Sequence, residues 1–112
     1  MTHNMKLHFQ PFEMIKNGDK IYELRLYDEK RRKINLDDKI VFTNENGEEL
    51  KVKVIGLYKF SSFKELYQAL PLEKCGYLKE ELATASYTDM LEYYSISEQE
   101  KYGVLAMEIS LI

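Results

Sequence analysis

Gly18-Asp19-Lys20-Ile21-Tyr22-Glu23-Leu24-Arg25 is the stretch that decides the fold of this chain. Its glycine tolerates the left-handed backbone that ends helices, and the residues after it favour a strand. Because side chains alternate along a strand, Glu23 and Arg25 share one face, whereas Leu24 lies on the opposite, apolar face. Lys20 stands where the chain turns into the strand. Spacing alone favours a solvated ion pair on an exposed strand face, which contributes little energy.

Alternating apolar residues predict further strands on both sides of this stretch. Asn46-Gly47 between two such runs is a strong hairpin signal, so the runs around it should pair antiparallel. Gly56 predicts a bend or bulge in the second of them. His3 falls in a tail that we expect to be disordered. The predicted strands are Lys6–Phe9, Lys39–Asn44, Glu49–Tyr58 and Val104–Leu111.

Helical signals fill the gaps between the predicted strands. A helix should run from Pro11 to Asn17-Gly18, and a second should begin at Ser61 or Ser62 and end at Pro71. Three short helical pieces are predicted at Lys79–Ala85, Thr88–Tyr94 and Ser97–Tyr102, with Thr88 and Ser97 as caps. Between the strands, Ile34–Asp38 reads as a turn with Leu36 pointing in and Asp37-Asp38 pointing out. Strands with helical insertions indicate an α+β class, a small curled sheet or barrel with helices attached.

Composition limits the possible functions. The 112 residues fit a single domain, residues 1–112, and no apolar run approaches the roughly 20 residues that span a bilayer. Without a signal-like N-terminus, we expect a cytoplasmic protein. The single cysteine, Cys75, excludes an internal disulfide and is expected to be a buried structural thiol; neither a metal site nor a cofactor is predicted.

Charge gives no argument for non-specific nucleic-acid binding, because the formal net charge is -3, from 16 basic and 19 acidic residues. Any such binding must come from a local patch. The one candidate is the run Lys30-Arg31-Arg32-Lys33, which follows the charged strand directly. Runs of this kind are usually solvated loops. Its closeness in sequence to Lys20 and Arg25 nevertheless makes a combined basic surface plausible.

Read as G-x-K-x-x-E-x-R, the residues Gly18, Lys20, Glu23 and Arg25 resemble the signature of the ASCH domain family. Runs that resemble this family follow in the same order at Lys33–Asn44 and at Lys101–Ile109, so that the resemblance covers nearly all of the chain. It implies a PUA-like fold, a small mixed or antiparallel β-barrel with peripheral short helices.

The resemblance also implies a ligand site, in a cleft between barrel and helices, for RNA or for a nucleotide or nucleoside. There Lys20 and Arg25 would contact phosphate or a base edge, while Glu23 would accept hydrogen bonds from an exocyclic amine or hold Arg25 in place. Tyrosines could stack on unpaired bases, although core packing is the commoner role of any one of them. The residues predicted to bind the ligand are Gly18, Lys20, Glu23, Arg25, Lys30, Arg31, Arg32, Tyr93 and Tyr94.

Two other functions stay open. One branch of ASCH-like proteins hydrolyses the acetyl amide of N4-acetylcytidine with a lysine that matches Lys20, and ribonuclease activity is proposed in the broader family. As an enzyme, the chain would use Lys20 as base with Glu23, or a downstream carboxylate such as Glu98, as partner. Glu23, however, stands where the amidohydrolase branch has threonine. The third possibility is a non-catalytic small-ligand or protein-interaction module, which would have a mainly apolar cleft.

Overall fold

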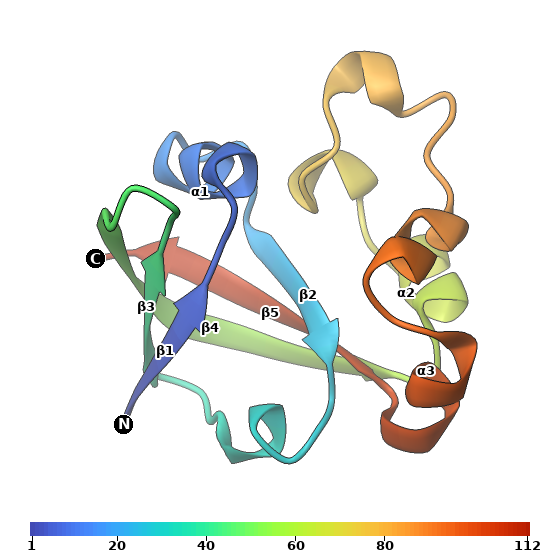
Figure 1. Ribbon diagram of the computed structural model, residues 1–112, viewed down its shortest axis with the longest axis horizontal. Coiled ribbons are helices and arrows are strands. Elements are labelled where there is room, and N and C mark those ends of the chain that lie inside the picture. The colour runs from blue at the N-terminus through green and yellow to red at the C-terminus, as the bar shows by residue number, and fades with distance from the viewer.

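The computed structural model describes residues 1–112 as a curled five-stranded sheet surrounded by short helices (Figure 1). The strands are β1 (Thr2–Lys6), β2 (Tyr22–Leu26), β3 (Lys39–Thr43), β4 (Glu49–Phe60) and β5 (Val104–Leu111). The α-helices are α1 (Phe9–Lys16), α2 (Phe63–Ala69) and α3 (Ile96–Tyr102). Four 3₁₀ turns are η1 (Arg31–Lys33), η2 (Leu72–Lys74), η3 (Lys79–Glu81) and η4 (Tyr87–Glu92). The chain therefore has the α+β class and the peripheral short helices predicted for it, and the predicted barrel is a curled half-barrel sheet.

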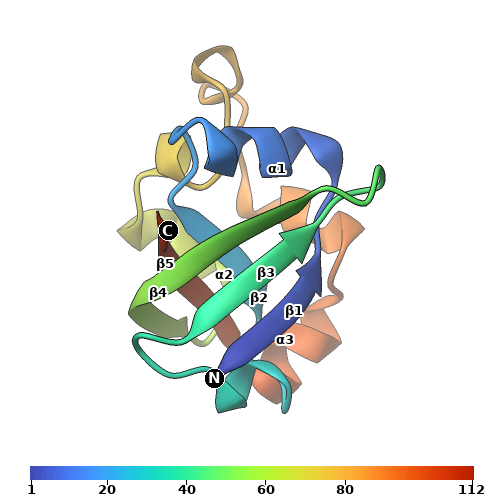
Figure 2. The same cartoon turned by 90° about the vertical axis from the view of Figure 1, so that its left-hand side faces the viewer.

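The sheet has the strand order β1-β3-β4-β5-β2 and curls so that its two edge strands approach each other (Figure 2). β1 runs parallel to β3, and the other three pairs are antiparallel. β1 and β2 are not paired with each other, so the barrel stays open along one side. We call this opening between β1 and β2 the seam.

The hairpin predicted at Asn46-Gly47 is present, since β3 and β4 pair antiparallel with Thr43 opposite Glu49. The bend predicted at Gly56 is also present, because the pairing of β4 with β5 shifts register between Val54 and Gly56. A Cβ atom at Gly56 would lie 2.9 Å from the Tyr58 ring, so a larger residue there would force that ring to move.

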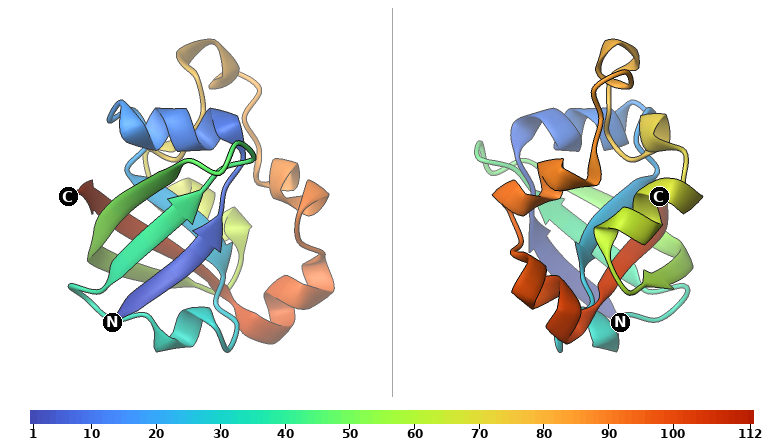
Figure 3. Two further views of the ribbon diagram at one scale, coloured as in Figure 1. Left: turned by 60° about the vertical axis from the view of Figure 1, so that its left-hand side comes forward. Right: turned by 90° about the vertical axis from the view of Figure 1, so that its right-hand side faces the viewer.

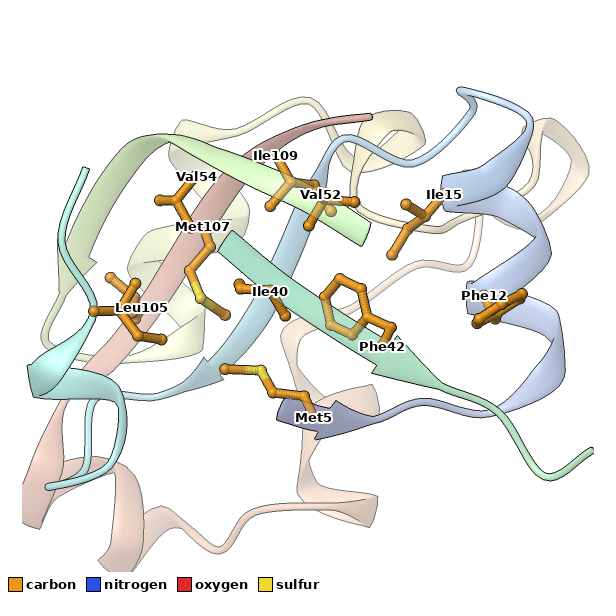
Figure 4. Packing of buried hydrophobic residues seen from close by; sticks show 11 residues of the cluster. Met5, Phe12, Ile15, Ile40, Phe42, Val52, Val54, Leu105, Met107 and Ile109 are labelled. Carbon is orange, nitrogen blue, oxygen red and sulfur yellow. The ribbon is translucent and has the colours of Figure 1, made fainter. Parts of the chain in front are cut away.

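The larger core fills the inside of the curl. Phe12 and Ile15 of α1 close one end of it, and this helix ends as predicted at Asn17-Gly18, where Gly18 has φ 88° (Figure 4). A second cluster packs the outer side of β2 and β5 against α2 and the segments after it. The first cluster contains Met5, Phe12, Ile15, Ile34, Ile40, Phe42, Val52, Val54, Leu105, Met107 and Ile109. The second contains Leu24, Leu26, Phe63, Leu66, Cys75, Val104 and Ala106.

The first strand begins earlier than predicted. It covers Thr2–Lys6, whereas His8 is the exposed residue before α1. His3, expected in a disordered tail, lies in β1, with its Nε2 atom 2.8 Å from Oδ2 of Asp38. Pairing of Thr2 to Lys6 with β3 outweighs the polarity of this segment.

The turn before β3 differs from the prediction at Leu36 and Asp38, whereas Asp37 is exposed as predicted. Leu36 is 58% exposed, whereas Asp38 is buried and accepts a hydrogen bond from the backbone N–H of Asn35 at 3.0 Å. The backbone turns at Asp37, which has a φ of 72°, and the buried carboxylate of Asp38 is held by His3 as well as by Asn35. A buried aspartate thus joins this turn to β1.

Helix caps agree with the prediction at Ser62, which accepts a hydrogen bond from the backbone N–H of Glu65. In the last two helical pieces the caps are Ser86 and Ser95, rather than Thr88 and Ser97. The caps lie two residues earlier because Ser86 and Ser95 have the extended backbone that an N-cap requires. None of the helices is long and apolar enough to cross a membrane.

Candidate ligand-binding cleft

A cleft of about 1450 Å³ opens over the seam. Its near wall is β1 with the start of α1 and the β3–β4 turn, and its far wall is formed by residues of the segment 67–94. Figures 1 and 3 show this segment as a set of short turns and connecting loops outside the sheet. The floor is formed by residues of β2 and by Lys20 just before it.

Three charged residues on this floor form one network. The Nζ atom of Lys20 lies 2.9 Å from Oε1 of Glu23. Arg25 donates from Nε at 2.9 Å and from Nη2 at 2.8 Å, both to Oε2 of Glu23. Each carboxylate oxygen is therefore engaged by a different cation, and the network carries one net positive charge.

The network lies inside the protein, contrary to what spacing alone favours. Only 4% of the Glu23 side chain and 9% of the Lys20 side chain are exposed. The register explains the burial: Glu23 stands opposite Met107 on the inner face of the curl, whereas Leu24 stands opposite Ala106 on the outer face. Other parts of the protein cover both faces of β2. The charged face, which carries Glu23 and Arg25, therefore lies within the opening of the barrel.

Two cations keep Glu23 ionised despite its burial. Burial alone would raise the pKa of this carboxyl, but the charges and hydrogen bonds of Lys20 and Arg25 outweigh it, and the pKa lies below its ordinary value. Burial likewise acts to lower the pKa of Arg25, but Glu23 outweighs it and the net shift is upward. Glu23 and Arg25 thus hold each other in their charged forms.

Arg25 also bridges the seam. Its Nη2 donates to the backbone carbonyl of Lys6 at 3.0 Å, which connects the β2 edge with the end of β1. The guanidinium therefore fixes the mouth of the barrel as well as the carboxylate of Glu23.

Gly76 is a site residue that the sequence reasoning missed. Its φ of 111° is one that other residues rarely adopt, and a Cβ there would lie 3.2 Å from Cδ and 3.4 Å from Nζ of Lys20. Gly76 therefore lets the far wall close over the lysine. Its neighbour Cys75 is buried, as predicted, and burial raises the pKa of the thiol to about 11, so the thiol stays protonated. The sequence signal that could have identified Gly76 was a glycine in a predicted loop, next to a cysteine predicted to be buried.

The basic run separates into two parts. Lys30 and Arg31 line the cleft, and Arg31 is held by Asp28 at 3.0 Å. Arg32 lies outside it: its guanidinium sits 4.4 Å from the Tyr27 ring centroid and donates to the carbonyl of Tyr102. Gly18 lies outside the cleft as well, beside a smaller hollow at the end of α1.

The two predicted tyrosines both line the cleft but differ in their surroundings. Tyr94 stacks on Phe63, with ring centroids 5.7 Å apart and planes at 20°, so its ring is largely used in packing. Tyr93 is 59% exposed and offers its ring to the solvent. Glu98 does not line the cleft; its side chain caps α3 through Ser95.

A chain of hydroxyl groups in the far wall was also missed. The hydroxyl oxygens of Tyr67 and Tyr77 lie 2.7 Å apart, and Tyr77 donates to Oδ2 of Asp89 at 2.7 Å. All three residues line the cleft. Their sequence separation hides the cluster, because α2, the loop after η2 and η4 each supply one member.

The structure contains no group of three or more histidine, cysteine, aspartate or glutamate residues that could hold a metal ion.

Charges of both signs line the cleft, and the cations and the anions are equal in number. The cations are Lys6, Lys20, Arg25, Lys30 and Arg31, and the anions are Glu23, Glu45, Glu81, Asp89 and Glu92.

Comparison with known proteins gives the family. The ASCH domain model matches residues 5–112. The solved structure of the hypothetical protein PH0355 is 40% identical with a TM-score of 0.84 over 100% of both chains. PF0455 from Pyrococcus furiosus is 34% identical with a TM-score of 0.73, over 100% of this chain and 98% of that one.

A more distant structure shares the fold alone. The ASCH domain from Lactobacillus crispatus is 12% identical with a TM-score of 0.65, over 98% of this chain and 79% of the other. Among proteins of curated function, none matches this sequence. With the family model covering nearly the whole chain, the protein belongs to the ASCH domain family.

Proposed function

We propose that this protein binds single-stranded RNA or a nucleotide in the cleft, over the network of Lys20, Glu23 and Arg25. The observation that carries the proposal is the buried carboxylate of Glu23, which holds two cations side by side on the floor of an open cleft. The ASCH family is generally thought to bind RNA, and this arrangement gives the binding a physical basis.

Glu23 leaves donors of both cations free for a ligand. It takes one of the three N–H groups of Lys20, while Arg25 uses Nε and Nη2 within the protein and keeps its Nη1 amine. An ammonium and a guanidinium held in fixed positions suit a phosphate oxygen or the acceptor edge of a base. In this proposal Glu23 positions the two cations and does not itself contact the ligand.

The size of the cleft favours a short single strand. Its volume of about 1450 Å³ exceeds the roughly 1,000 Å³ at the upper end for pockets that hold one small molecule. The exposed ring of Tyr93 on the wall offers a stacking surface, which an unpaired base can use and a base within a duplex cannot. Lys30 and Arg31, on the same cleft, would hold backbone phosphates.

The polarity of the lining argues against an apolar ligand. Only 11 of the 29 residues that line the cleft are hydrophobic, so charged and polar residues outnumber the hydrophobic ones around it. A module built for an apolar small molecule or an apolar peptide face would have the opposite balance. The charges of both signs equally disfavour a long polyanion wrapped around the whole surface.

A hydrolase is the second candidate, because one observation favours it. Nζ of Lys20 and Oε1 of Glu23 are 2.9 Å apart in an open cleft, which is a distance at which a proton can be transferred between a base and its partner. Incubation with N4-acetylcytidine and with single-stranded RNA, followed by product analysis, tests it. Turnover that Lys20→Ala abolishes would establish an enzyme, and absence of turnover would remove this candidate.

Binding is tested by fluorescence anisotropy with a labelled single-stranded RNA of mixed sequence. Lys20→Ala and Arg25→Ala should each weaken the affinity about ten-fold or more, since each removes a charged hydrogen-bond donor. Lys51→Ala is the matched control, because it removes the same charge from the exposed face of β4, outside the cleft. Its affinity should equal that of the unmodified protein.

Thermal unfolding of each variant separates a lost contact from a lost fold. Affinity that stays unchanged in folded Lys20→Ala and Arg25→Ala proteins would overturn the proposed site. An equal loss in Lys51→Ala would point to general electrostatic attraction and would overturn it too.

A further inference from the structure

Three hydroxyl and carboxylate groups in the far wall form a directed chain of hydrogen bonds. Asp89 accepts from the hydroxyl of Tyr77 at 2.7 Å, and the hydroxyls of Tyr77 and Tyr67 are 2.7 Å apart. The rings of the two tyrosines meet edge to face, with centroids 5.9 Å apart and planes at 84°. The capping interaction of Asp89 with the backbone N–H of Ser86 at 3.1 Å holds the carboxylate in place.

The direction of this chain follows from the chemistry of its members. A carboxylate only accepts, so the single hydroxyl hydrogen of Tyr77 goes to Asp89. The oxygen of Tyr77 must then accept from Tyr67, which uses up the single hydrogen of Tyr67. What Tyr67 still has to offer at the cleft is an oxygen with a free lone pair, which accepts hydrogen bonds and donates none.

Both hydroxyls stay protonated at neutral pH, so this direction persists. Burial raises the pKa of Tyr67 to about 12. Burial, followed by the hydrogen bonds to Tyr67 and Asp89, likewise raises the pKa of Tyr77. The chain therefore presents a neutral acceptor, and neither tyrosine is a phenolate.

This acceptor shares the cleft with the charged network. Tyr77 follows Gly76, whose backbone packs against the Lys20 side chain, so one loop connects the two features. Glu23 is the acidic residue on the floor, but both of its oxygens already accept from Lys20 or Arg25. The floor thus offers donors, and on the far wall Tyr67 offers an uncharged acceptor in addition to the carboxylates of Glu81, Asp89 and Glu92.

We propose that Tyr67 is a specificity-determining residue, whose hydroxyl oxygen accepts a hydrogen bond from the amino group of a ligand base. The cleft then prefers cytosine to uracil, because uracil has a carbonyl oxygen where cytosine has its amine. A carbonyl placed against the lone pairs of Tyr67 leaves two acceptors facing each other without a hydrogen. This inference rests on the proposed function and adds to it the kind of base that is read.

The test compares short oligonucleotides of cytidine and of uridine, labelled in the same way, in anisotropy titrations. The unmodified protein should bind the cytidine oligonucleotide about ten-fold more tightly. Tyr67→Phe should weaken cytidine binding until the two affinities are equal. Tyr77→Phe removes the oxygen to which Tyr67 donates within the protein. The Tyr67 hydroxyl then becomes free to donate to the carbonyl oxygen of uracil, so uridine binding should become tighter.

Tyr87→Phe is the matched control, because Tyr87 belongs to η4 but lies outside the cleft, with its ring beside Lys64. This variant should keep the ten-fold ratio between its affinities for the cytidine and the uridine oligonucleotide. If the tyrosines have a merely structural role, Tyr77→Phe should weaken the binding of both oligonucleotides by the same factor. That result would overturn the inference.

The outcomes separate the two proposals. Binding that depends on Lys20 but does not distinguish cytidine from uridine would overturn only the role of Tyr67. A preference that persists in Tyr67→Phe would also overturn only that role. Absence of binding to either oligonucleotide would overturn the proposed function, and this inference with it.

Discussion

The side chain of Lys20 lies against the backbone of Gly76, so closely that a Cβ there would be 3.2 Å from Cδ of the lysine. This contact joins the floor of the cleft to its far wall. It also makes the geometry of the charged network dependent on a residue that carries no functional group.

Gly76→Ala should therefore lower both stability and RNA affinity. The backbone at φ 111° would be strained by about 1–3 kcal/mol, and the added methyl would displace Lys20 from Glu23. Gly47→Ala is the matched control, since φ is 80° but no atom lies within 4 Å of the added methyl. It should lose stability and keep its affinity. Urea unfolding and RNA titration of both variants check this, and unchanged affinity in Gly76→Ala would contradict it.

Glu23→Gln should destabilise the protein by about 3–5 kcal/mol, because it leaves the buried Lys20 and the partly buried Arg25 without their counter-charge. Glu49→Gln, on the exposed start of β4, should change stability by less than about 0.5 kcal/mol. Chemical denaturation at neutral pH measures both. A loss of less than about 1 kcal/mol for Glu23→Gln would mean that the network is solvated in solution.

Acid should weaken the attachment of β1 through Asp38. The hydrogen bond with His3, and after it the backbone N–H of Asn35, lower the pKa of Asp38 from 3.8 to about 2. Its contribution to stability is complete above pH 3.8, the unfolded value, and is lost as the pH falls towards 2.

Denaturation curves recorded from pH 6 down to about pH 2 test this contribution. Asp38→Asn should be less stable near neutral pH and should lack the part of the acid-induced decline that belongs to this carboxyl. Asp37→Asn is the control, because its carboxylate is exposed and asparagine tolerates its positive φ. A decline of equal size in Asp38→Asn and in the unmodified protein would contradict the assignment.

Binding of RNA should depend only moderately on salt. Lys20, Arg25, Lys30 and Arg31 are the cations best placed to contact phosphates, and each contact to a single strand contributes a slope of about -0.7. The logarithm of the association constant should thus fall against that of the salt concentration with a slope no steeper than about -3. Arg25→Ala should reduce this slope by about 0.7, whereas Arg32→Ala should leave it unchanged. A much steeper slope would indicate a contact surface beyond the cleft.

Local sequence signals predicted the architecture well where a single segment determines its own structure. The Asn46-Gly47 hairpin, the bend at Gly56 and the stop at Gly18 each depend on conformations that few residues adopt. The prediction was wrong at Asp38, since burial of this aspartate depends on His3, a partner 35 residues away.

The candidate site shows the same limit. Glu23 and Arg25 lie in β2 and Lys20 lies just before it, so the three are close in the sequence, and the structure brings them into one network. That the network is buried depends on the register with β5, and the chain of Tyr67, Tyr77 and Asp89 depends on three separate segments. Periodicity within one segment cannot reveal either of them.

Arg25, described above as the bridge across the seam, has one more consequence. β1 and β2 each have one edge without a partner strand, and such edges can pair with strands of other molecules. A guanidinium bonded to Lys6 across that opening, with Glu23 and Lys20 buried beside it, fills the opening with charge that an incoming strand would have to displace. The network of Lys20, Glu23 and Arg25, proposed as part of the ligand site, thus also protects the open side of the barrel from aggregation by strand addition.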